Sequence, residues 1–169
     1  MLARQKLLLG KVNFKLGRYH KSLNWLEAVI LPEISEEEKA ETYLYLGKSF
    51  NMLKLYELGI TNFTLCLKFN PRHFEGAMAL AHATDQRAKM LLDPVASRRA
   101  VRNFIEAAKI NPDSVEALFG VIKTFREYEK NHGDAAIAML EQTLDKFPRN
   151  YRVRTILAGF KLFKEDYFA

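Results

Sequence analysis

The side chains that most often carry catalysis or bind metals are few in this sequence. Its histidines are His20, His73, His82 and His132, and none of them has the His-x-x-x-His spacing that places two imidazoles on one helix face. Cys66 is the only cysteine, so the chain builds no cysteine zinc cluster and no internal disulfide. Glycine-rich phosphate loops are absent from the sequence. The sequence therefore predicts a protein that is not an enzyme, with no catalytic residues, no metal and no cofactor.

An acidic run surrounds Ser35. Its carboxylates are Glu33, Glu36, Glu37, Glu38 and Glu41. Such a run offers a site for a basic partner, but a serine followed by glutamates also stabilises the N-terminus of a helix. We favour the helix cap.

Two basic clusters are candidates for contact with phosphate. They consist of Arg98, Arg99 and Arg102, and of Arg149, Arg152 and Arg154. Charged residues near helix ends are usually only solvated, and no RNA-binding motif accompanies these arginines. A basic helical-repeat protein that binds RNA is nevertheless the alternative function to be tested, and steep salt dependence of binding would be its signature.

Length and composition bound the class of protein. The 169 residues, 49% of them hydrophobic, suffice for one domain or a short repeat array. The formal net charge of +6 favours acidic partners, although it carries no information on the fold. No apolar stretch approaches the roughly 18 residues of a membrane helix, and no signal peptide is evident. With a single cysteine, we expect an intracellular protein of the cytoplasm or nucleus, with no membrane contact.

Apolar residues recur every three or four positions almost throughout, which predicts an all-α fold. Proline, glycine and asparagine interrupt this pattern at regular intervals, for example at Gly17, Pro32, Pro71 and Pro112. The interruptions predict helices near residues 3–16, 19–31, 36–53, 56–69, 73–91, 95–110, 114–130, 134–147 and 150–164.

One segment carries a repeat motif in full. It runs Tyr43-x-x-Leu46-Gly47-x-x-Phe50, then Tyr56, Gly59-x-x-x-Phe63-x-x-Cys66 and Pro71. This segment resembles a tetratricopeptide repeat (TPR), whose pattern is W-x-x-L-G-x-x-Y, then A-x-x-x-F, then P. The resemblance implies a right-handed solenoid of helical hairpins.

Partial copies of the same motif occur elsewhere. Second helices recur as Ala100-x-x-x-Phe104-x-x-Ala107 before Pro112 and as Ala136-x-x-x-Leu140-x-x-Thr143 before Pro148. Looser copies lie at both ends, which gives about four and a half repeats. We expect residues 1–169 to form a single TPR-like domain that is a piece of a longer solenoid.

The repeat implies that small residues of one helix leave gaps for large residues of the next, because a hairpin cannot bury its own apolar face. The expected gaps are Gly47, Gly59, Ala100, Ala107 and Ala136. The expected bulky residues are Phe50, Phe63, Phe104, Phe125 and Leu140. Cys66 stands where the family usually has alanine, so we expect it in the core.

In TPR proteins the concave groove is lined by particular positions of each first helix. At one such position the successive copies have Leu7, Leu44, Met78 and Phe119, and one helical turn later they have Lys11, Lys48, His82 and Lys123. The resemblance thus implies an apolar ladder beside a basic ladder, which suits an acidic or amphipathic segment of a partner. A second interpretation has equal weight: the apolar ladder packs against neighbouring helices and the lysines only solvate the groove.

Some TPR proteins hold the terminal carboxylate of a chaperone tail with lysine and asparagine. Leu7 and Leu44 stand at the lysine position here, and Lys11 and Lys48 at the asparagine position, which argues against that ligand. The function that the sequence favours is a scaffold or adaptor of a multiprotein complex, which binds a peptide or helix of another protein in its groove.

Overall fold

The computed structural model describes residues 2–29, 31–128, 133–146, 148–151, 153–155, 157, 158 and 161. These residues contain helices and turns but no strand, as the sequence predicted. The elements are α1 (Ala3–Lys15), α2 (Tyr19–Glu27), the 3-10 helix η1 (Leu31–Glu33), α3 (Glu36–Met52), α4 (Tyr56–Phe69), α5 (Phe74–Leu91), α6 (Pro94–Ile110), α7 (Val115–Tyr128) and α8 (Gly133–Lys146).

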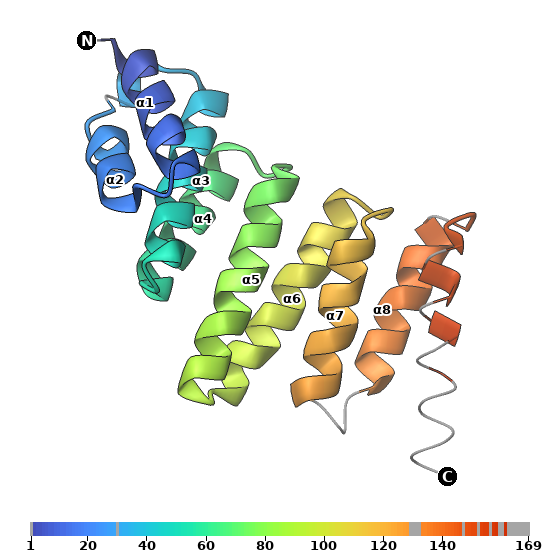
Figure 1. Cartoon of the computed structure of the whole chain (residues 1–169). Helices are drawn as coiled ribbons and strands as arrows, with labels where there is room; N and C mark the ends of the chain where they lie inside the picture. The colour runs from blue at the N-terminus through green and yellow to red at the C-terminus, as the bar shows by residue number, and fades with distance from the viewer. Residues whose placement is uncertain are drawn as a thin grey trace.

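The helices form a row of antiparallel hairpins (Figure 1). The helices α1 and α2, α3 and α4, and α5 and α6 pair within hairpins. Each second helix also packs on the first helix of the next hairpin, as α2 does on α3, α4 on α5 and α6 on α7. The chain is therefore a helical-hairpin solenoid in which every internal helix has a neighbour on both sides.

One predicted helix is too long. The sequence predicted a helix over residues 19–31, but α2 ends at Glu27 and a separate 3-10 turn begins at Leu31. Pro32 accounts for the difference, because in a helix continued to this residue it would have no N–H to donate to the carbonyl of Ala28, and its ring would clash with that carbonyl. Val29, between the two elements, is buried in the N-terminal part of the core. The predicted helix over 150–164 lies largely outside the described residues.

The turns inside the first two hairpins have the same geometry. Gly17 follows α1 with φ +71°, and Lys54 follows α3 with φ +62°, both in the left-handed region. The residues before them, Leu16 and Leu53, also match, with φ/ψ of −82°/5° and −83°/5°. Lysine is strained in this conformation and glycine is not. The first two hairpins therefore share the backbone conformation of their turns, as expected for two copies of one structural repeat.

Close contact between small and large residues holds each hairpin together. A Cβ atom placed on Gly47 would lie 2.5 Å from the ring of Phe63, and one placed on Gly10 would lie 2.5 Å from Leu26. Phe63 and Leu26 are among the most buried side chains of the described chain. The predicted roles of Gly47 and Phe63 are confirmed, and Gly10 and Leu26 repeat them sixteen residues apart in the first hairpin.

Most of the other predicted packing residues are also buried. Gly59, Ala100, Ala107, Phe104 and Leu140 are all in the core, and Phe50 is half-buried against its N-terminal part. Cys66 is fully buried, as expected. The side chains of Phe125 and Ala136 lie outside the described residues.

Gly47→Ala tests the packing within the hairpin. We expect the free energy of unfolding to fall by about 1–2 kcal/mol, since overpacking costs ~1–3 kcal/mol and the better helix propensity of alanine offsets up to ~1 kcal/mol. Urea denaturation measures this, and Thr64→Ala on the exposed side of α4 is the control, expected to change stability by no more than about 0.5 kcal/mol. A Gly47→Ala protein as stable as the wild type would contradict the contact with Phe63.

Lys54→Gly tests the shared turn from the opposite direction. The substitution removes the left-handed strain, worth ~1–2 kcal/mol, and adds the ~0.5–1 kcal/mol entropy cost of glycine, so we expect stabilisation by about 0.5–1 kcal/mol. Gly17→Ala, at the equivalent turn, should destabilise the protein by a similar amount. Thermal unfolding of both variants measures the two effects. If the midpoint temperature moved in the same direction in both variants, the two turns would not be equivalent.

Candidate functional site

The first helices α1, α3, α5 and α7 contribute one side each to a shared surface, which we call the first-helix surface. The residues predicted to form a basic ladder lie on it, and three of them contact a carboxylate of the next first helix. The pairs are Lys11 with Glu41, Lys48 with Glu75 at 2.5 Å and His82 with Glu116 at 3.2 Å. Lys123 is exposed on α7.

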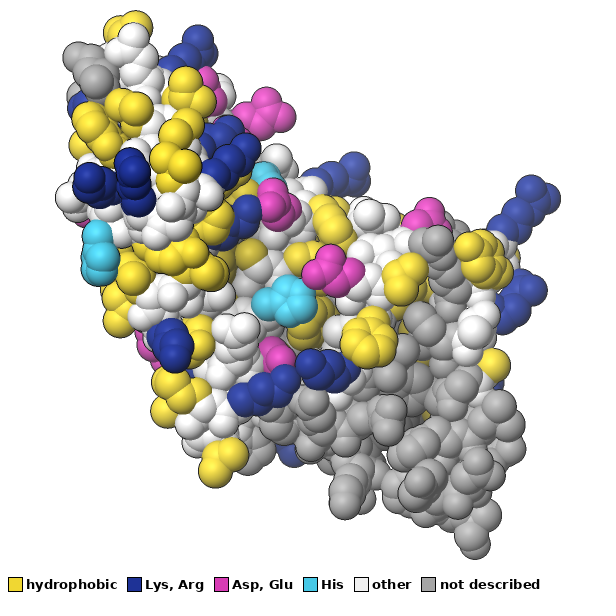
Figure 2. Space-filling model, viewed as in Figure 1, with side chains coloured by type: hydrophobic (Ala, Val, Ile, Leu, Met, Phe, Trp, Pro, Cys, Tyr) yellow, Lys and Arg dark blue, Asp and Glu magenta, His cyan; other side chains and the backbone are white. Residues whose placement is uncertain are grey.

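These pairs change the electrostatic character of the surface. The charges of Lys11 and Lys48 are offset by those of their partners, so the surface carries mixed charge rather than a basic stripe. Figure 2 shows acidic, basic and histidine side chains interspersed across the middle of the face in view. Because each pair is partly exposed, it contributes only ~0–1 kcal/mol to the folding stability. The main effect of these pairs is on the charge of the surface.

The expectation of an open apolar ladder is wrong for three of its four residues. Leu7, Leu44 and Met78 are 5%, 1% and 5% exposed, because they pack into the core between helices. This is the second interpretation considered for the sequence. Phe119, in contrast, is 61% exposed on α7 and remains free to contact a partner.

Aromatic rings add to the surface between α1 and α3. Phe14 contacts Tyr45 edge to face, with ring centroids 5.5 Å apart. The Nζ atom of Lys48 lies 4.8 Å from the centroid of Tyr45, within the range of a cation–π interaction. The sequence analysis did not select these residues, although Phe14 and Tyr45 lie three and one positions beyond ladder residues.

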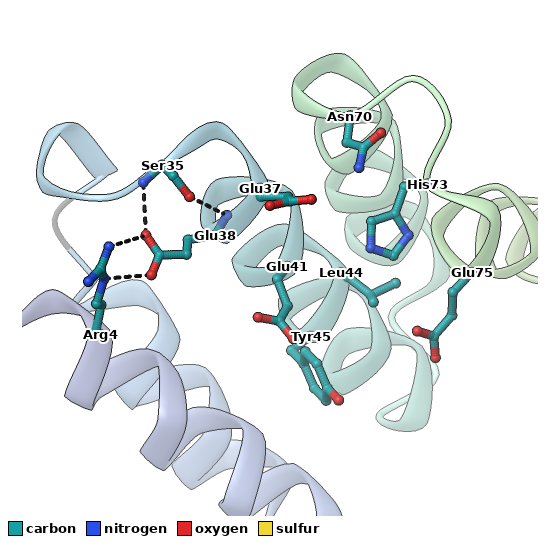
Figure 3. Close-up of a pocket in the computed structure, with 10 residues that line it drawn as sticks. All are labelled: Arg4, Ser35, Glu37, Glu38, Glu41, Leu44, Tyr45, Asn70, His73 and Glu75. Atoms are coloured by element: carbon teal, nitrogen blue, oxygen red, sulfur yellow. Dashed lines mark hydrogen bonds and ion pairs between the residues drawn. The ribbon is translucent and has the colours of Figure 1, made fainter.

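A pocket of about 480 Å³ opens between α1, α3 and the start of α5. Its lining comprises Arg4, Ser35, Glu37, Glu38, Glu41, Leu44, Tyr45, Asn70, His73 and Glu75. Figure 3 shows Glu41 and Tyr45 projecting from α3 on one side of the space, with His73 and Glu75 across from them. Four of the ten lining residues are glutamates, but Glu38, Glu41 and Glu75 each form an ion pair, so Glu37 is the one lining carboxylate without a cation partner among the described residues.

The glutamates of the pocket have different partners. Glu38 forms a capping box with Ser35: the Ser35 N–H donates to Oε2 of Glu38 at 2.9 Å, and the Glu38 N–H donates to Oγ of Ser35 at 3.2 Å. Arg4 binds the same carboxylate at 2.6 Å (Figure 3). The predicted helix cap is thus confirmed. Glu37 is exposed and forms no hydrogen bond or ion pair with the residues that the structure describes.

The bond from the Ser35 N–H is the main reason why the pKa of Glu38 lies below its ordinary value, and Arg4 lowers it further. Both interactions favour the charged form of the carboxyl.

His73 and Cys66 lie near the pocket and have structural roles. The Nδ1 atom of His73 accepts the Gly76 N–H at 3.1 Å and so caps α5. Burial raises the pKa of the Cys66 thiol to about 11, which keeps it protonated at neutral pH and unreactive. Within the described part of the chain, no three His, Cys, Asp or Glu side chains are grouped as metal ligands would be. None of the described helices combines the length and apolar character needed to cross a membrane.

The two arginine clusters do not form one patch. Arg98, Arg99 and Arg102 are exposed near the start of α6. Asn150, which precedes Arg154, donates a hydrogen bond to the carbonyl of Pro112 just beyond the other end of α6. At 1.5 Å per residue the clusters are therefore separated by roughly 15–20 Å along this helix. Arg149 and Arg154 are exposed, and Arg152 lies outside the described residues.

The stacked hairpins, the repeated turn and the small-to-large contacts together define a tetratricopeptide-repeat fold, and solved structures agree. MamA matches at a TM-score of 0.67 with 17% identity, over 89% of this chain and 81% of that one. TTC0263, a TPR protein of Thermus thermophilus, matches at 0.60 with 17% identity, over 95% and 99%. The second TPR domain of human RPAP3 matches at 0.60 with 13% identity, over 72% and 97%.

No protein-family model and no curated protein matches the sequence. At identities of 13–17% the likeness to these structures is one of fold.

Arg4→Gln tests the electrostatics at the edge of the pocket. We expect the pKa of Glu38, followed by carboxyl NMR, to rise but to stay below its ordinary value, because the larger effect of the Ser35 N–H remains. Since the folded-state pKa is depressed, the stabilising contribution of Glu38 is present above its unfolded pKa and is lost as the pH falls through the folded value. Lys15→Gln, on the same helix but outside the pocket, should leave this pKa unchanged. A Glu38 pKa that does not respond to Arg4→Gln would contradict the ion pair.

Proposed function

We propose that this protein is a non-catalytic interaction scaffold that binds a segment of another protein across its first-helix surface. The observation that carries the proposal is the pocket between α1, α3 and α5, whose lining comes from consecutive hairpins. Because each hairpin contributes only part of the pocket, its shape depends on the stacking that the fold enforces. The volume of the pocket lies within the range of ligand sites, and its lining is more polar than that of most small-molecule pockets, which favours a charged side chain of a peptide.

The human RPAP3 domain supports a peptide as the ligand. Its structure contains an HSP70 peptide with the sequence SGPTIEEVD, so this fold accommodates a peptide in that protein. That peptide is acidic, whereas the pocket here is lined by four glutamates. We infer that the present protein selects a segment of different charge, consistent with the absence of the chaperone-tail residues from its first helices.

The pocket favours a lysine or arginine side chain of the partner. Glu37 has no partner in the described chain, whereas the ring of Tyr45 already lies within cation–π range of Lys48. Glu41 and Glu75 line the same pocket, although Lys11 and Lys48 already bind them. The partner's cation would therefore be recognised mainly by Glu37, with Glu41 and Glu75 sharing its charge.

The other end of the first-helix surface favours a different contact. Phe119 and Lys123 are both exposed on α7, one helical turn apart. An apolar side chain followed by a carboxylate would satisfy this pair. We therefore infer an amphipathic partner segment whose basic residue occupies the pocket and whose apolar and acidic residues contact α7. The partner segment is thus amphipathic, as the sequence analysis expected. The part of it that contacts α1 and α3 is now basic, where the sequence analysis expected an acidic segment.

Capture of partners from a native extract, followed by mass spectrometry, tests the proposal. Glu37→Lys reverses the charge of the pocket and should lose a protein that the wild type retains. Glu33→Lys makes the same charge change at an exposed position outside the pocket lining and should retain it. Phe119→Ala should weaken retention more than Lys123→Ala, because interface energy concentrates in buried large side chains.

Circular dichroism establishes that each variant is folded. Retention of the same partner by wild type, Glu37→Lys and Phe119→Ala alike would exclude the first-helix surface. Retention of nucleic acid that is lost with rising salt would instead support the RNA-binding alternative at the arginine clusters.

A further inference from the structure

The turn between α5 and α6 presents a cluster of exposed apolar side chains at the lower side of the solenoid in Figure 1. Four large side chains lie there within six residues, and they are 61%, 53%, 87% and 59% exposed: Met90, Leu91, Leu92 and Val95. We call these four residues the α5–α6 tip. Leu92 has the largest exposed fraction of any large hydrophobic side chain that the structure describes.

The backbone at Leu92 is strained. Its φ of +50° lies in the left-handed region, as do those of Gly17 and Lys54 in the turns of the two preceding hairpins. A leucine is strained in this region where a glycine is not, and an exposed leucine gains little packing energy in return. Strained backbone and exposed apolar clusters both concentrate at functional sites. A contact outside the chain therefore explains this leucine better than the stability of the turn does.

A helix cap holds the tip in one shape. Oδ1 of Asp93 accepts the N–H groups of Val95 at 2.9 Å and of Ala96 at 3.2 Å, and Pro94 is the first residue of α6. Oδ2 of Asp93 lies 3.8 Å from Arg87, so this carboxylate is engaged within the chain. The apolar side chains thus project from a rigid support, and binding through them needs little ordering of the backbone.

Basic side chains follow the tip along α6. Arg98, Arg99 and Arg102 are exposed, three, four and seven residues after Val95. At 1.5 Å per residue they lie roughly 5–10 Å from Val95 along the helix axis. Amphipathic elements at a bilayer surface bury their apolar side to a similar depth of about 5–10 Å. When the hairpin stands upright on a bilayer with its tip among the acyl chains, these arginines lie at the level of the headgroups.

The carboxylates at this end of α4 and α5 do not cancel the arginines. Glu57 and Asp93 both lie beside Arg87, and Asp85 binds Lys89 at 2.7 Å. The charge of the tip region is therefore set by the arginines of α6. Figure 2 shows hydrophobic side chains at the lower margin of the face in view, with Lys and Arg side chains beside them.

These features favour a lipid surface over nucleic acid. No aromatic residue occurs between His82 and Phe104, whereas sites for single-stranded nucleic acid stack bases on aromatic rings. A projecting aliphatic turn enters a bilayer without needing a cavity of matching shape. Anionic headgroups also complement the arginines behind it.

We propose that the α5–α6 tip binds the surface of a bilayer that contains anionic lipid. Its four apolar side chains insert among the headgroups and the first acyl carbons, while Arg98 and Arg99 bind anionic headgroups. The contact is peripheral and reversible, because stable anchoring by a short apolar segment needs a second, electrostatic signal. The sequence analysis expected no membrane contact, and the proposal changes that expectation for the tip alone. It does not depend on the proposed peptide site.

Co-sedimentation of the full 169-residue chain with vesicles tests the proposal. The vesicles contain phosphatidylcholine alone, or phosphatidylcholine and phosphatidylserine at about 7 to 3, and we expect at least roughly tenfold stronger binding to the mixed vesicles. Leu92→Gly should weaken that binding at least about fivefold, because the burial of the leucine is lost. The same change relieves the left-handed strain, so the midpoint temperature of unfolding should rise. Weaker binding by a more stable protein excludes a folding defect.

Val95→Asp places a charge in the inserted surface and should weaken binding to the mixed vesicles at least about tenfold. Val115→Asp is the matched control, because Val115 is 54% exposed in the first turn of α7. It should change binding by no more than about twofold, since its charge lies outside the tip. Both substitutions place a carboxylate near a helix N-terminus, which is favourable, so both proteins should fold.

A pair of double variants tests the arginines. Arg98→Gln with Arg99→Gln should weaken binding to the mixed vesicles roughly tenfold to thirtyfold, because each basic side chain at an anionic surface contributes to the affinity. Arg149→Gln with Arg154→Gln removes the same charge from the other arginine cluster and should weaken binding by no more than about threefold.

Three outcomes would overturn the proposal. The first is that the chain binds the two kinds of vesicle equally, or binds neither at millimolar lipid, whether or not it retains single-stranded RNA. The second is that both arginine pairs weaken binding equally while Leu92→Gly has no effect, since net charge alone would then be responsible. The third is a lower unfolding temperature for Leu92→Gly, because the leucine would then serve the fold.

Discussion

The fit of a large side chain into the space left by a glycine is the contact on which this structure depends. The ring of Phe63 occupies the space that a Cβ atom of Gly47 would fill, and Leu26 does the same at Gly10. These contacts let the two helices of a hairpin approach so closely that no water enters between them. They do not cover the outer faces of the hairpin, so the next hairpin must complete the core. The solenoid follows from this incomplete burial.

The same stacking determines the chemistry of the surface. Because successive first helices lie side by side in the stack, a cation on one of them meets a carboxylate on the next, as Lys48 meets Glu75. The repeat also brings side chains of α1, α3 and α5 around one pocket. The proposed binding site is therefore a property of several hairpins together, and the charge of the first-helix surface depends on pairs that join them.

The sequence predicted the fold better than the site. The range of α4 and the burial of Gly47, Phe63 and Cys66 depend on local pattern and repeat spacing, both visible in the sequence. The early end of α2 was missed although Pro32 was available as a signal. The orientation of Leu44 toward the core and the pairing of Lys48 depend on how neighbouring helices pack, and the degenerate register did not specify that packing.

Amide hydrogen exchange tests most directly whether each hairpin completes the core of its neighbour. Val12, Ser49 and Ala83 occupy equivalent positions, but only the last two are covered by a preceding second helix. The account predicts that the amides of Ser49 and Ala83 exchange at least roughly tenfold more slowly than that of Val12, because local opening is easier where few apolar contacts must break. Equal protection at the three positions in the isolated protein would contradict the account.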